Sequence, residues 1–466
     1  MTVLGHSAAS VKKSRLTPPE FWWSAVDGKR VNFKPTLSIL IALGLALVSA
    51  VVGLSYLPWN ASAGDADHEV AVLFPSSDVA AWPDFVRGVH LAAKAKNLSV
   101  IEDSSRHAVR VMTSPRPTRF QWYPVIGSFA LQNKVRDLCQ RPVPPLAVVG
   151  ANNTALTKAI GTEVFSASRP DWVPLLLMTH ATTDQLIDVN PGRSFRFGFS
   201  NSYQARTVVR ELATMLPDDS NSSTPLQAIV VQVADNPFSV DLANHFAQEL
   251  KESLGATILN DPNVSPDSSR TNWMLPTAGR GAEGATAEEV ALARRIVQTL
   301  SQNPNAPSAI VLPTDLDTFR HLVLAIDQEK KRQTFAKPIY LLSGDSLDYY
   351  DVTEGLPTNM MPGPLLFFSH VNPVDRSISN APLSHRPAVG LNRDLAHTLL
   401  SAMGRLGQQA TPDQLSAALR EAGPEEDRIS FNAFERADGG AALVAYANPM
   451  GEGFEIRLPK AWASSP

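Results

Sequence analysis

Residues 146–199 place the strongest constraint on how this chain can fold. Two short apolar runs, at 146–149 and 173–178, each end in a loop of small and hydroxylated residues, and a helix-like segment lies between them. Buried strands that alternate with helices are typical of an open parallel sheet, which binds ligands beyond the carboxyl ends of its strands. The two loops, at 150–154 and 179–183, are therefore predicted to form one wall of a small-molecule cleft.

The same alternation extends along the chain in both directions. A first series runs up to residue 199 and a second starts after residue 201, so the 466 residues predict an α/β protein with two lobes, each built on a doubly wound parallel sheet. We expect Ser239 to be the N-cap of a helix at 239–254. The other expected strands are 70–74, 109–112, 228–233, 309–312 and 338–342, and the other expected helices are 85–95, 125–138, 205–216, 286–300 and 317–326.

The segment 37–57 carries no charged residue and is long enough, as a helix, to cross about 30 Å of hydrocarbon. Basic residues prevail before it and acidic residues follow it. This distribution predicts a cytoplasmic tail at 1–36, a linker at 58–67 and an extracytoplasmic (periplasmic) position for the rest. A cleaved signal peptide is the alternative, because residues 61–63 resemble a cleavage site. We expect an uncleaved, single-pass anchor, since the tail and the apolar run are both long for a signal peptide.

Charge and composition exclude several classes of function. The formal net charge of −4 and the pI near 6.2 give no reason to expect a nucleic-acid partner. The single cysteine, Cys139, excludes an intrachain disulfide and a cysteine-cluster metal site. Residues 279–284 match the dinucleotide pattern G-x-G-x-x-G, but no strand-length apolar run leads into them. Nucleophile-elbow and zinc-protease spacings are also lacking, so we expect no cofactor, no metal and no enzymatic activity.

Four segments, in their order and spacing, resemble the type I periplasmic solute-binding proteins, especially the branched-chain amino acid binding group of ABC transport systems. The segments are a strand and turn at 146–155, a turn at 178–186, an interlobe crossover at 195–205, and a strand, acidic loop and helix at 228–243. Within the second segment, Ala181 and Thr182 match the family pattern. The resemblance implies two α/β lobes that close around a small ligand.

The resemblance also implies where the ligand would bind. In amino-acid binders, hydroxyl groups and helix N-terminal amides hold the ligand carboxylate, and an acidic residue takes the amino group; helix N-termini favour anions physically as well. The sequence departs from the family at Thr179 and His180, which replace a proline-containing turn, and at Phe238, where a hydroxyl is lost. The candidate ligand-binding residues are Trp82, Asn153, Thr154, Ala181, Thr182, Phe238, Asp315 and Asp345.

Each candidate residue also has a purely structural interpretation. Thr182 and Gln185 have the spacing of a capping box, which would occupy the threonine hydroxyl. Asn153, Thr154 and Asp345 are residue types that cap helices and turns, Trp82 can pack over the edge of its lobe, and His180 is expected to be a packed loop histidine.

These observations together predict a membrane-anchored solute-binding protein that binds a small polar, amino-acid-like ligand for ABC-type transport or sensing. Lobe 1 is expected at 68–199 and 372–435, lobe 2 at 200–371 and 436–466, with crossovers near Phe199, Phe368 and Glu435. The predicted partners are the ligand, the lipid bilayer through residues 37–57, and an ABC permease or another membrane protein. Two alternatives stay open: a ligand-free interaction module that keeps the fold, and a hydrolase that depends on one serine.

Overall fold

The computed structural model describes residues 67–466 apart from 152, 191, 217–223, 262–272, 276–284, 358–360, 422–430, 433, 437–438, 448–452 and 464–466. No helix in this part of the chain combines the length and the apolar character needed to cross a membrane. The predicted tail and anchor at 1–57, the linker up to residue 66 and the glycine-rich loop at 279–284 all lie outside the described residues.

The first of two large sheets is built from strands at the beginning and near the end of the described chain. Its strands are β1 (His68–Val72), β2 (Val100–Asp103), β3 (Ala108–Val111), β4 (Thr118–Trp122), β5 (Ala147–Val149), β6 (Leu175–Met178), β7 (Ser194–Arg196), β15 (Phe431–Asn432) and β16 (Glu435–Arg436). They lie in the order β15-β16-β7-β6-β5-β1-β4-β3-β2. The central strands β4, β1, β5, β6 and β7 are parallel, and β2 and β3 form an antiparallel edge.

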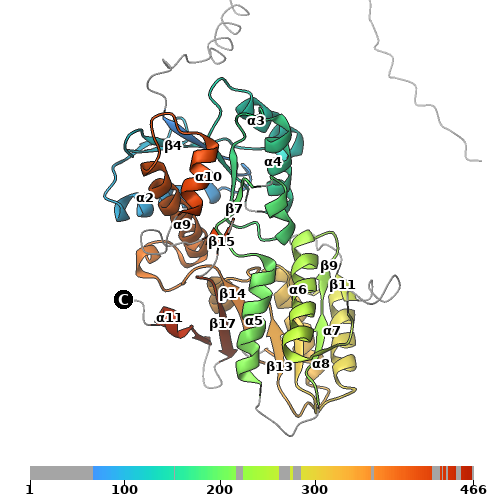
Figure 1. Cartoon of the computed structure of the whole chain (residues 1–466). Coiled ribbons are helices and arrows are strands. Elements are labelled where there is room, and N and C mark those ends of the chain that lie inside the picture. The colour runs from blue at the N-terminus through green and yellow to red at the C-terminus, as the bar shows by residue number, and fades with distance from the viewer. Residues whose placement is uncertain are drawn as a thin grey trace, which may run out of the picture. The chain divides into compact units, whose positions relative to one another are not determined.

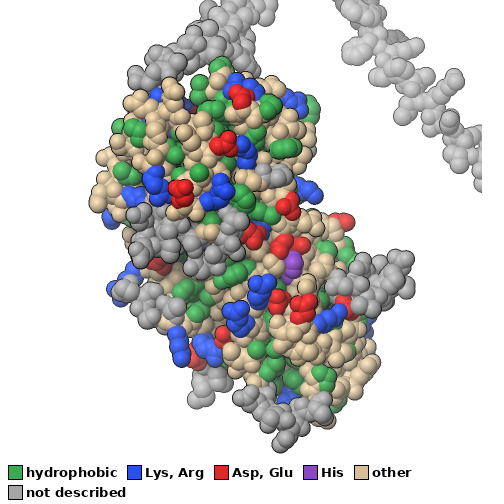
Figure 2. Space-filling model, in the orientation of Figure 1, with side chains coloured by type: hydrophobic (Ala, Val, Ile, Leu, Met, Phe, Trp, Pro, Cys, Tyr) green, Lys and Arg blue, Asp and Glu red, His purple; other side chains and the backbone are tan. Residues whose placement is uncertain are grey.

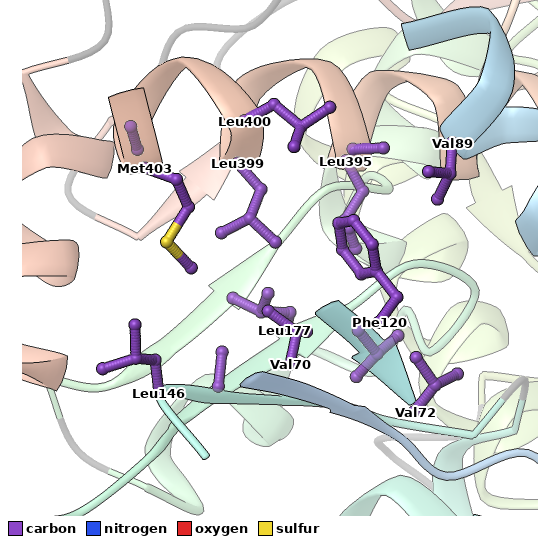
Figure 3. Packing of buried hydrophobic residues seen from close by; sticks show 14 of the residues in the cluster. Val70, Val72, Val89, Phe120, Leu146, Leu177, Leu395, Leu399, Leu400 and Met403 are labelled. Atoms are coloured by element: carbon purple, nitrogen blue, oxygen red, sulfur yellow. The ribbon is translucent and has the colours of Figure 1, made fainter. Parts of the chain in front are cut away.

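Helices cover both faces of this sheet, and we call the sheet with its helices lobe 1. Because successive side chains of a strand point to opposite faces, Val70 and Val72 of β1 pack under α2 (Ala81–Ala95), α9 (Arg386–Gly404) and α10 (Pro412–Arg420). Ala71 and Leu73 pack under α3 (Gly127–Cys139) and α4 (Thr154–Ala167) on the other face. Figure 3 shows the first layer, in which leucines of α9 lie over the strand residues and Phe120.

The second large sheet, which with its helices we call lobe 2, comes mainly from the middle of the chain. Its strands are β8 (Gln227–Val230), β10 (Thr257–Ile258), β12 (Ser308–Val311), β13 (Ile339–Leu342), β14 (Leu365–Ser369), β17 (Ala441–Ala447) and β18 (Phe454–Arg457). The order is β10-β8-β12-β13-β14-β17-β18, with the first five strands parallel and the last two antiparallel. A small separate sheet pairs β9 (Gln232–Val233) with β11 (Met274–Leu275).

Lobe 2 repeats the three-layer arrangement of lobe 1. Helices α5 (Asn201–Met215) and α6 (Pro237–Leu254) pack on one face through residues such as Phe246, and α7 (Ala287–Leu300) and α8 (Leu316–Lys330) pack on the other through residues such as Phe319. The remaining helices are short: η1 (Asp184–Asp188), η3 (Asp351–Gly355), η5 (Arg376–Ile378), η6 (Leu383–His385) and α11 (Lys460–Ala463).

The predicted α/β class with parallel sheets is confirmed, and several local predictions are corrected. Helix α6 begins at Pro237 with Asn236 as its N-cap, so the prediction for Ser239 was wrong; its hydroxyl instead accepts a hydrogen bond from the Val233 N–H. The apolar run at 228–233 is divided between β8 and β9. Helix α2 begins at Ala81, four residues before the predicted start, which places Trp82 in its first turn.

The chain passes between the two sheets after β7, after β14 and after β16, and these passages meet near the centre of the molecule (Figure 1). The first leads directly from β7 into α5, and the second leads from β14 through η5 and η6 into α9. The third leads from β16 to β17. The carboxyl ends of β6 and β7 in lobe 1 and of β13 and β14 in lobe 2 therefore face the same region.

Candidate functional site

The strand ends and passages that meet between the lobes form a region that we call the junction, comprising residues 179–184, 196–204, 343–345, 370–371 and 435–436. Its centre is His370, which directly follows β14 and is almost fully buried. The His370 Nδ1 atom accepts a hydrogen bond from the Phe199 N–H at 3.2 Å, so the ring proton lies on Nε2, which donates to Asp345 Oδ2 at 2.6 Å. One histidine thus joins two passages and the end of β13.

Gln204 and Gly198 bring the same segments still closer together. The Gln204 side chain donates to the Phe199 carbonyl at 3.2 Å and accepts from the Asp345 N–H at 3.0 Å. A Cβ atom at Gly198 would lie 2.3 Å from the Thr179 carbonyl oxygen, so only glycine allows β6 and the first passage to approach this closely.

Two buried arginines hold the third passage in place. Arg436, on β16, donates to the Phe197 carbonyl at 3.2 Å, pairs with Asp394 of α9 at 3.2 Å and places its guanidinium 4.8 Å from the Phe199 ring centre. Arg196, whose side chain is fully buried, pairs with Glu435 at 2.7 Å and donates to the Thr183 carbonyl at 2.7 Å. A buried guanidinium needs this many partners, because an unpaired buried charge is costly.

His180 shows how the charges of the junction act on one another. Burial, with a smaller contribution from His370, lowers the pKa of His180 to about 4, whereas Asp345 and Asp78 oppose the shift. The ring is therefore neutral at physiological pH. Since these groups come from both sheets and from the loop after β1, His180 lies where the strand ends of the two lobes face each other.

Several buried polar atoms at these strand ends have no hydrogen-bond partner among the described residues. Some unpartnered atoms, such as Asn190 Oδ1, lie inside a single lobe, whereas the unpartnered atoms at the strand ends belong to both lobes. Buried polar groups are normally hydrogen-bonded, and groups that are not indicate a place for a water, an ion or a ligand. These atoms are Thr179 Oγ1, His180 Nε2 and Thr182 Oγ1 after β6, Asn201 Oδ1 at the start of α5, Thr314 Oγ1 after β12, and Asp345 Oδ1 after β13.

Some of the candidate residues lie at or beside the junction. Ala181 and Thr182 are fully buried in it, and the hydroxyl of Thr154, at the start of α4, is hydrogen-bonded at 3.0 Å to that of Thr183. Asp345 belongs to the junction through its bond to His370. The predicted capping box at Thr182 is wrong, because the N-cap of η1 is Thr183 and the Thr182 hydroxyl makes no cap bond.

The other candidate residues have local roles. Asn153 accepts from the Leu156 N–H as the N-cap of α4, and Asp315 accepts from the Thr318 N–H as the N-cap of α8. Trp82 stacks on Phe85 and Trp122, with ring centres 5.7 and 5.9 Å away. Phe238, in the first turn of α6, packs against the lobe 2 core.

Two cavities of the described surface lie outside the predicted cleft. One, of about 500 Å³, is lined by His370, Arg393, Arg436 and Trp462 on the outer side of the junction. The other, of about 370 Å³, lies between α2, β2 and the start of α9. Neither is lined by any of the eight candidate residues.

Sequence reasoning missed the residues that organise the junction. His370 and Arg196 were not candidates, although His370 follows the buried run Leu365–Ser369 just as Asp345 follows β13. A polar residue directly after a buried strand was therefore an available signal for His370. For Arg196 the only signal was a charge among the phenylalanines at positions 195, 197 and 199, which predicts a buried ion pair without naming the partner.

No family model matches the sequence, and no curated protein matches it. Its fold, however, is shared by solved substrate-binding proteins. An ABC transporter substrate-binding protein from Desulfitobacterium hafniense is similar with a TM-score of 0.57 and 16% identity, over 84% of this chain and 100% of that one. A leucine-binding protein from Thermotoga maritima is similar with a TM-score of 0.53 and 13% identity, over 84% and 99%.

A third structure widens the range of ligands within this fold. The solute-binding protein of an ABC transporter from Rhodopseudomonas palustris, solved with p-hydroxybenzoic acid, has a TM-score of 0.55 and 13% identity, over 84% of this chain and 95% of that one. The fold of residues 67–466 is therefore that of the type I periplasmic binding proteins, and the structures it resembles are binding proteins, not enzymes.

Proposed function

We propose that this protein binds a small polar solute between its two lobes, at the junction. The supporting observation is the set of buried, unpartnered polar atoms at the strand ends of both lobes, above all Thr182 Oγ1 in lobe 1 and Asp345 Oδ1 in lobe 2. A solute in contact with both atoms would satisfy them and would bind both lobes at once. It would then shift the equilibrium toward the closed form by its difference in affinity for the two forms.

The chemistry of the junction favours an amino-acid-like solute. Threonine hydroxyls and the N-terminal amides of α4 are suited to a carboxylate, because helix N-termini carry a partial positive charge. The free Oδ1 atom of Asp345 is suited to an ammonium group, while Oδ2 stays bonded to His370. One similar structure, from Desulfitobacterium hafniense, was solved in complex with leucine. Trp82 and Phe238 are proposed to cover the apolar part of the solute.

We further propose that residues 37–57 anchor the protein as a single transmembrane helix, with 1–36 in the cytoplasm and the lobes outside it. The anchored lobes would then present their opening and closing to an ABC permease or to another membrane protein, for transport or for sensing. The charge distribution around 37–57 supports this orientation. Protease added to intact cells is expected to digest the lobes but to spare a tag placed at the N-terminus.

A ligand-free interaction module is the second candidate function. It is favoured by the hydrogen bonds that occupy several candidate side chains: Asn153 and Asp315 cap their own helices, and Thr154 is bonded to Thr183. In this case the junction would only set the angle between the lobes.

A thermal-shift panel on the full-length protein in detergent separates the two functions. The panel contains leucine, polar amino acids, benzoate, p-hydroxybenzoate and sugars. Solute binding predicts that one class raises the melting temperature, since a ligand at 100 times its Kd stabilises by about 2.7 kcal/mol. Silence across the panel would contradict solute binding and support the interaction module.

A matched pair of variants locates the binding. Thr182→Val removes the unpartnered hydroxyl of the junction and is expected to abolish the shift. Thr118→Val removes an equally buried hydroxyl at the amino end of β4, where it is bonded to Thr113, and is expected to leave the shift unchanged. An unchanged shift in Thr182→Val would place the solute elsewhere.

A further inference from the structure

A second cluster of polar side chains lies at the edge of the junction, where η1 of lobe 1 meets α6 of lobe 2. Asp184 is the first residue of η1, and Asp241 and His245 lie four residues apart on α6, so that both face the same side of the helix. One ligand atom from each residue lies within 4.8 Å of the other two. Figure 2 shows a histidine among acidic side chains at this level of the molecule.

We propose that Asp184, Asp241 and His245 bind a divalent zinc ion that bridges the two lobes. Imidazole and carboxylate ligands suit zinc, which takes three protein ligands and leaves one position for water or another group in open sites. Because Asp184 belongs to lobe 1 and the other two residues to lobe 2, the complete ligand set exists only when the lobes are together. Zinc would therefore favour the closed form, whether or not a solute is bound.

The distances fit a metal site better than a hydrogen-bonded cluster. His245 Nε2 lies 3.5 Å from Asp184 Oδ2 and 3.8 Å from Asp241 Oδ1, which is long for hydrogen bonds to a carboxylate. Four ligands around zinc at 2.0–2.1 Å in a tetrahedron are about 3.3 Å apart. The two distances from His245 are therefore within about 0.5 Å of the spacing of zinc ligands, and the two carboxylates lie within 4.8 Å of each other.

The surrounding hydrogen bonds orient both carboxylates toward His245. Asp184 Oδ1 accepts from the Ser202 N–H at 3.2 Å, which leaves Oδ2 on the side of the histidine. Asp241 Oδ2 accepts from Asn201 Nδ2 at 2.8 Å, which leaves Oδ1 on that side. Such bonds to the second oxygen are typical of carboxylates that bind metals.

Asn201 supplies an independent indication of a cation. Its side chain is fully buried and its amide is directed at Asp241, yet its Oδ1 atom has no partner in the described structure. An amide oxygen can only accept a hydrogen bond or bind a positive charge. This fully buried side chain, which contacts Asp241 directly, therefore lacks a donor or a cation beside the proposed ligands.

The balance of charge supports the same conclusion. Arg196 is near enough to feel the charges of Asp184 and Asp241, but its guanidinium is bonded to Glu435 and to the backbone oxygens of Thr183 and Asp184. Four carboxylates, those of Glu435, Asp184, Asp241 and Asp188, thus act on one guanidinium, and an excess of negative charge remains around it. The three proposed ligands are partly exposed, so an ion can enter from solvent.

Isothermal titration of the full-length protein with zinc chloride, after removal of metals by a chelator, tests the proposal. The wild type is expected to bind one zinc ion at this site, and Asp184→Asn, Asp241→Asn and His245→Ala are each expected to weaken that binding at least tenfold. The asparagine variants keep the hydrogen bonds from Ser202 and Asn201 and so preserve the fold. Magnesium chloride is expected to show no binding, because magnesium avoids imidazole.

His90→Ala is the matched control, because His90 also faces a carboxylate, Glu102 at 2.6 Å, but on the outer surface of lobe 1 and without a third ligand. Its zinc affinity should stay within twofold of the wild type. A wild type that does not bind zinc, or binding unchanged in His245→Ala, would overturn the proposal. Full affinity in Asp184→Asn would show that α6 alone holds the ion, which contradicts a bridge between lobes.

Discussion

The interiors of the two lobes and the centre of the junction between them are both deeply buried, but by opposite means. Inside lobe 1, Val70, Phe120 and Leu177 are fully buried among apolar neighbours, and their attraction has no preferred direction. In the junction, Arg196 and His370 are buried just as deeply, yet each is held by directional bonds to segments far away in the sequence. The interiors therefore depend on the volume and shape of their side chains, whereas the junction depends on each bonding partner.

This difference assigns rigidity to the lobes and movement to the junction. Apolar interiors keep each lobe rigid, because close packing has a single best arrangement. Directional bonds between lobes can be exchanged for bonds to water or to a solute at small net free energy, because a protein hydrogen bond contributes only about 1 kcal/mol net. The junction is thus the place where the molecule can open, and the variants below test that contrast.

The largest expected effect follows from removing the buried guanidinium. Arg196→Ala leaves two backbone oxygens and the partly exposed Glu435 without their donor and removes a fully buried side chain; it is expected to lower the free energy of unfolding by about 2–5 kcal/mol, measured by urea denaturation. Arg193→Ala is the control from just before the same strand, because Arg193 pairs with the exposed Asp413 and donates to one backbone carbonyl, that of Val173; it should cost about 1–2 kcal/mol. Equal losses in the two variants would remove the distinction between the junction and the surface.

The next largest effect is a dependence of the unfolding free energy on pH, which arises from His180. Its folded pKa of about 4 lies below the unfolded value of 6.5, so between these values the unfolded chain binds more protons and stability falls as the pH is lowered. His180→Leu is expected to remove up to about 3 kcal/mol of this dependence. The wild type alone is not diagnostic, because burial raises the pKa of Asp348 to about 6, and this shift acts in the opposite direction over nearly the same range.

The measurement for His180 is therefore the difference in unfolding free energy between wild type and variant at several pH values. The account predicts that His180→Leu gains on the wild type steadily from pH 6.5 to pH 4. A constant difference across that range would show that His180 titrates normally and is not enclosed by the two lobes.

Because β6 and the first passage approach each other closely, Gly198→Ala is expected to lower the free energy of unfolding, but by less than Arg196→Ala does. The added methyl group would meet the Thr179 carbonyl oxygen, and the forced shift should cost roughly 1–3 kcal/mol. Gly404→Ala is the control, because a Cβ at this helix end meets nothing within 4 Å, and it should be neutral or stabilising by up to about 1 kcal/mol. The melting temperatures of both variants are compared with that of the wild type. An unchanged melting temperature in Gly198→Ala would mean that β6 and the first passage are less closely packed than described.

The smallest effect on stability distinguishes a binding role from a structural one. Thr182→Val removes a buried hydroxyl that has no partner, so the variant should gain about 1 kcal/mol in unfolding free energy while losing the solute. A loss of stability instead would show that the hydroxyl has a structural partner, and the site would have to be placed elsewhere.

The sequence predicts the apolar parts of this molecule better than its polar parts. β6 and β13 could be predicted because four consecutive apolar residues are fully buried in each, and Thr182 and Asp345 became candidates because they follow those strands. The bonds of Arg196 to Glu435 and of His370 to Phe199 could not be predicted, because these partners lie 239 and 171 residues away along the chain. The N-cap of α6 was predicted wrongly for a different reason. Asn236 and Ser239 are both good capping residues, and only the backbone conformation decides which of them begins the helix.

The central claim, that a solute satisfies the unpartnered polar atoms of both lobes, is tested most directly by a crystal structure with the compound that stabilises the protein most. The account predicts electron density between the lobes, with polar atoms within hydrogen-bond distance of Thr182 Oγ1 and Asp345 Oδ1. Density for the compound at another place, with these two atoms bonded only to protein, would contradict it.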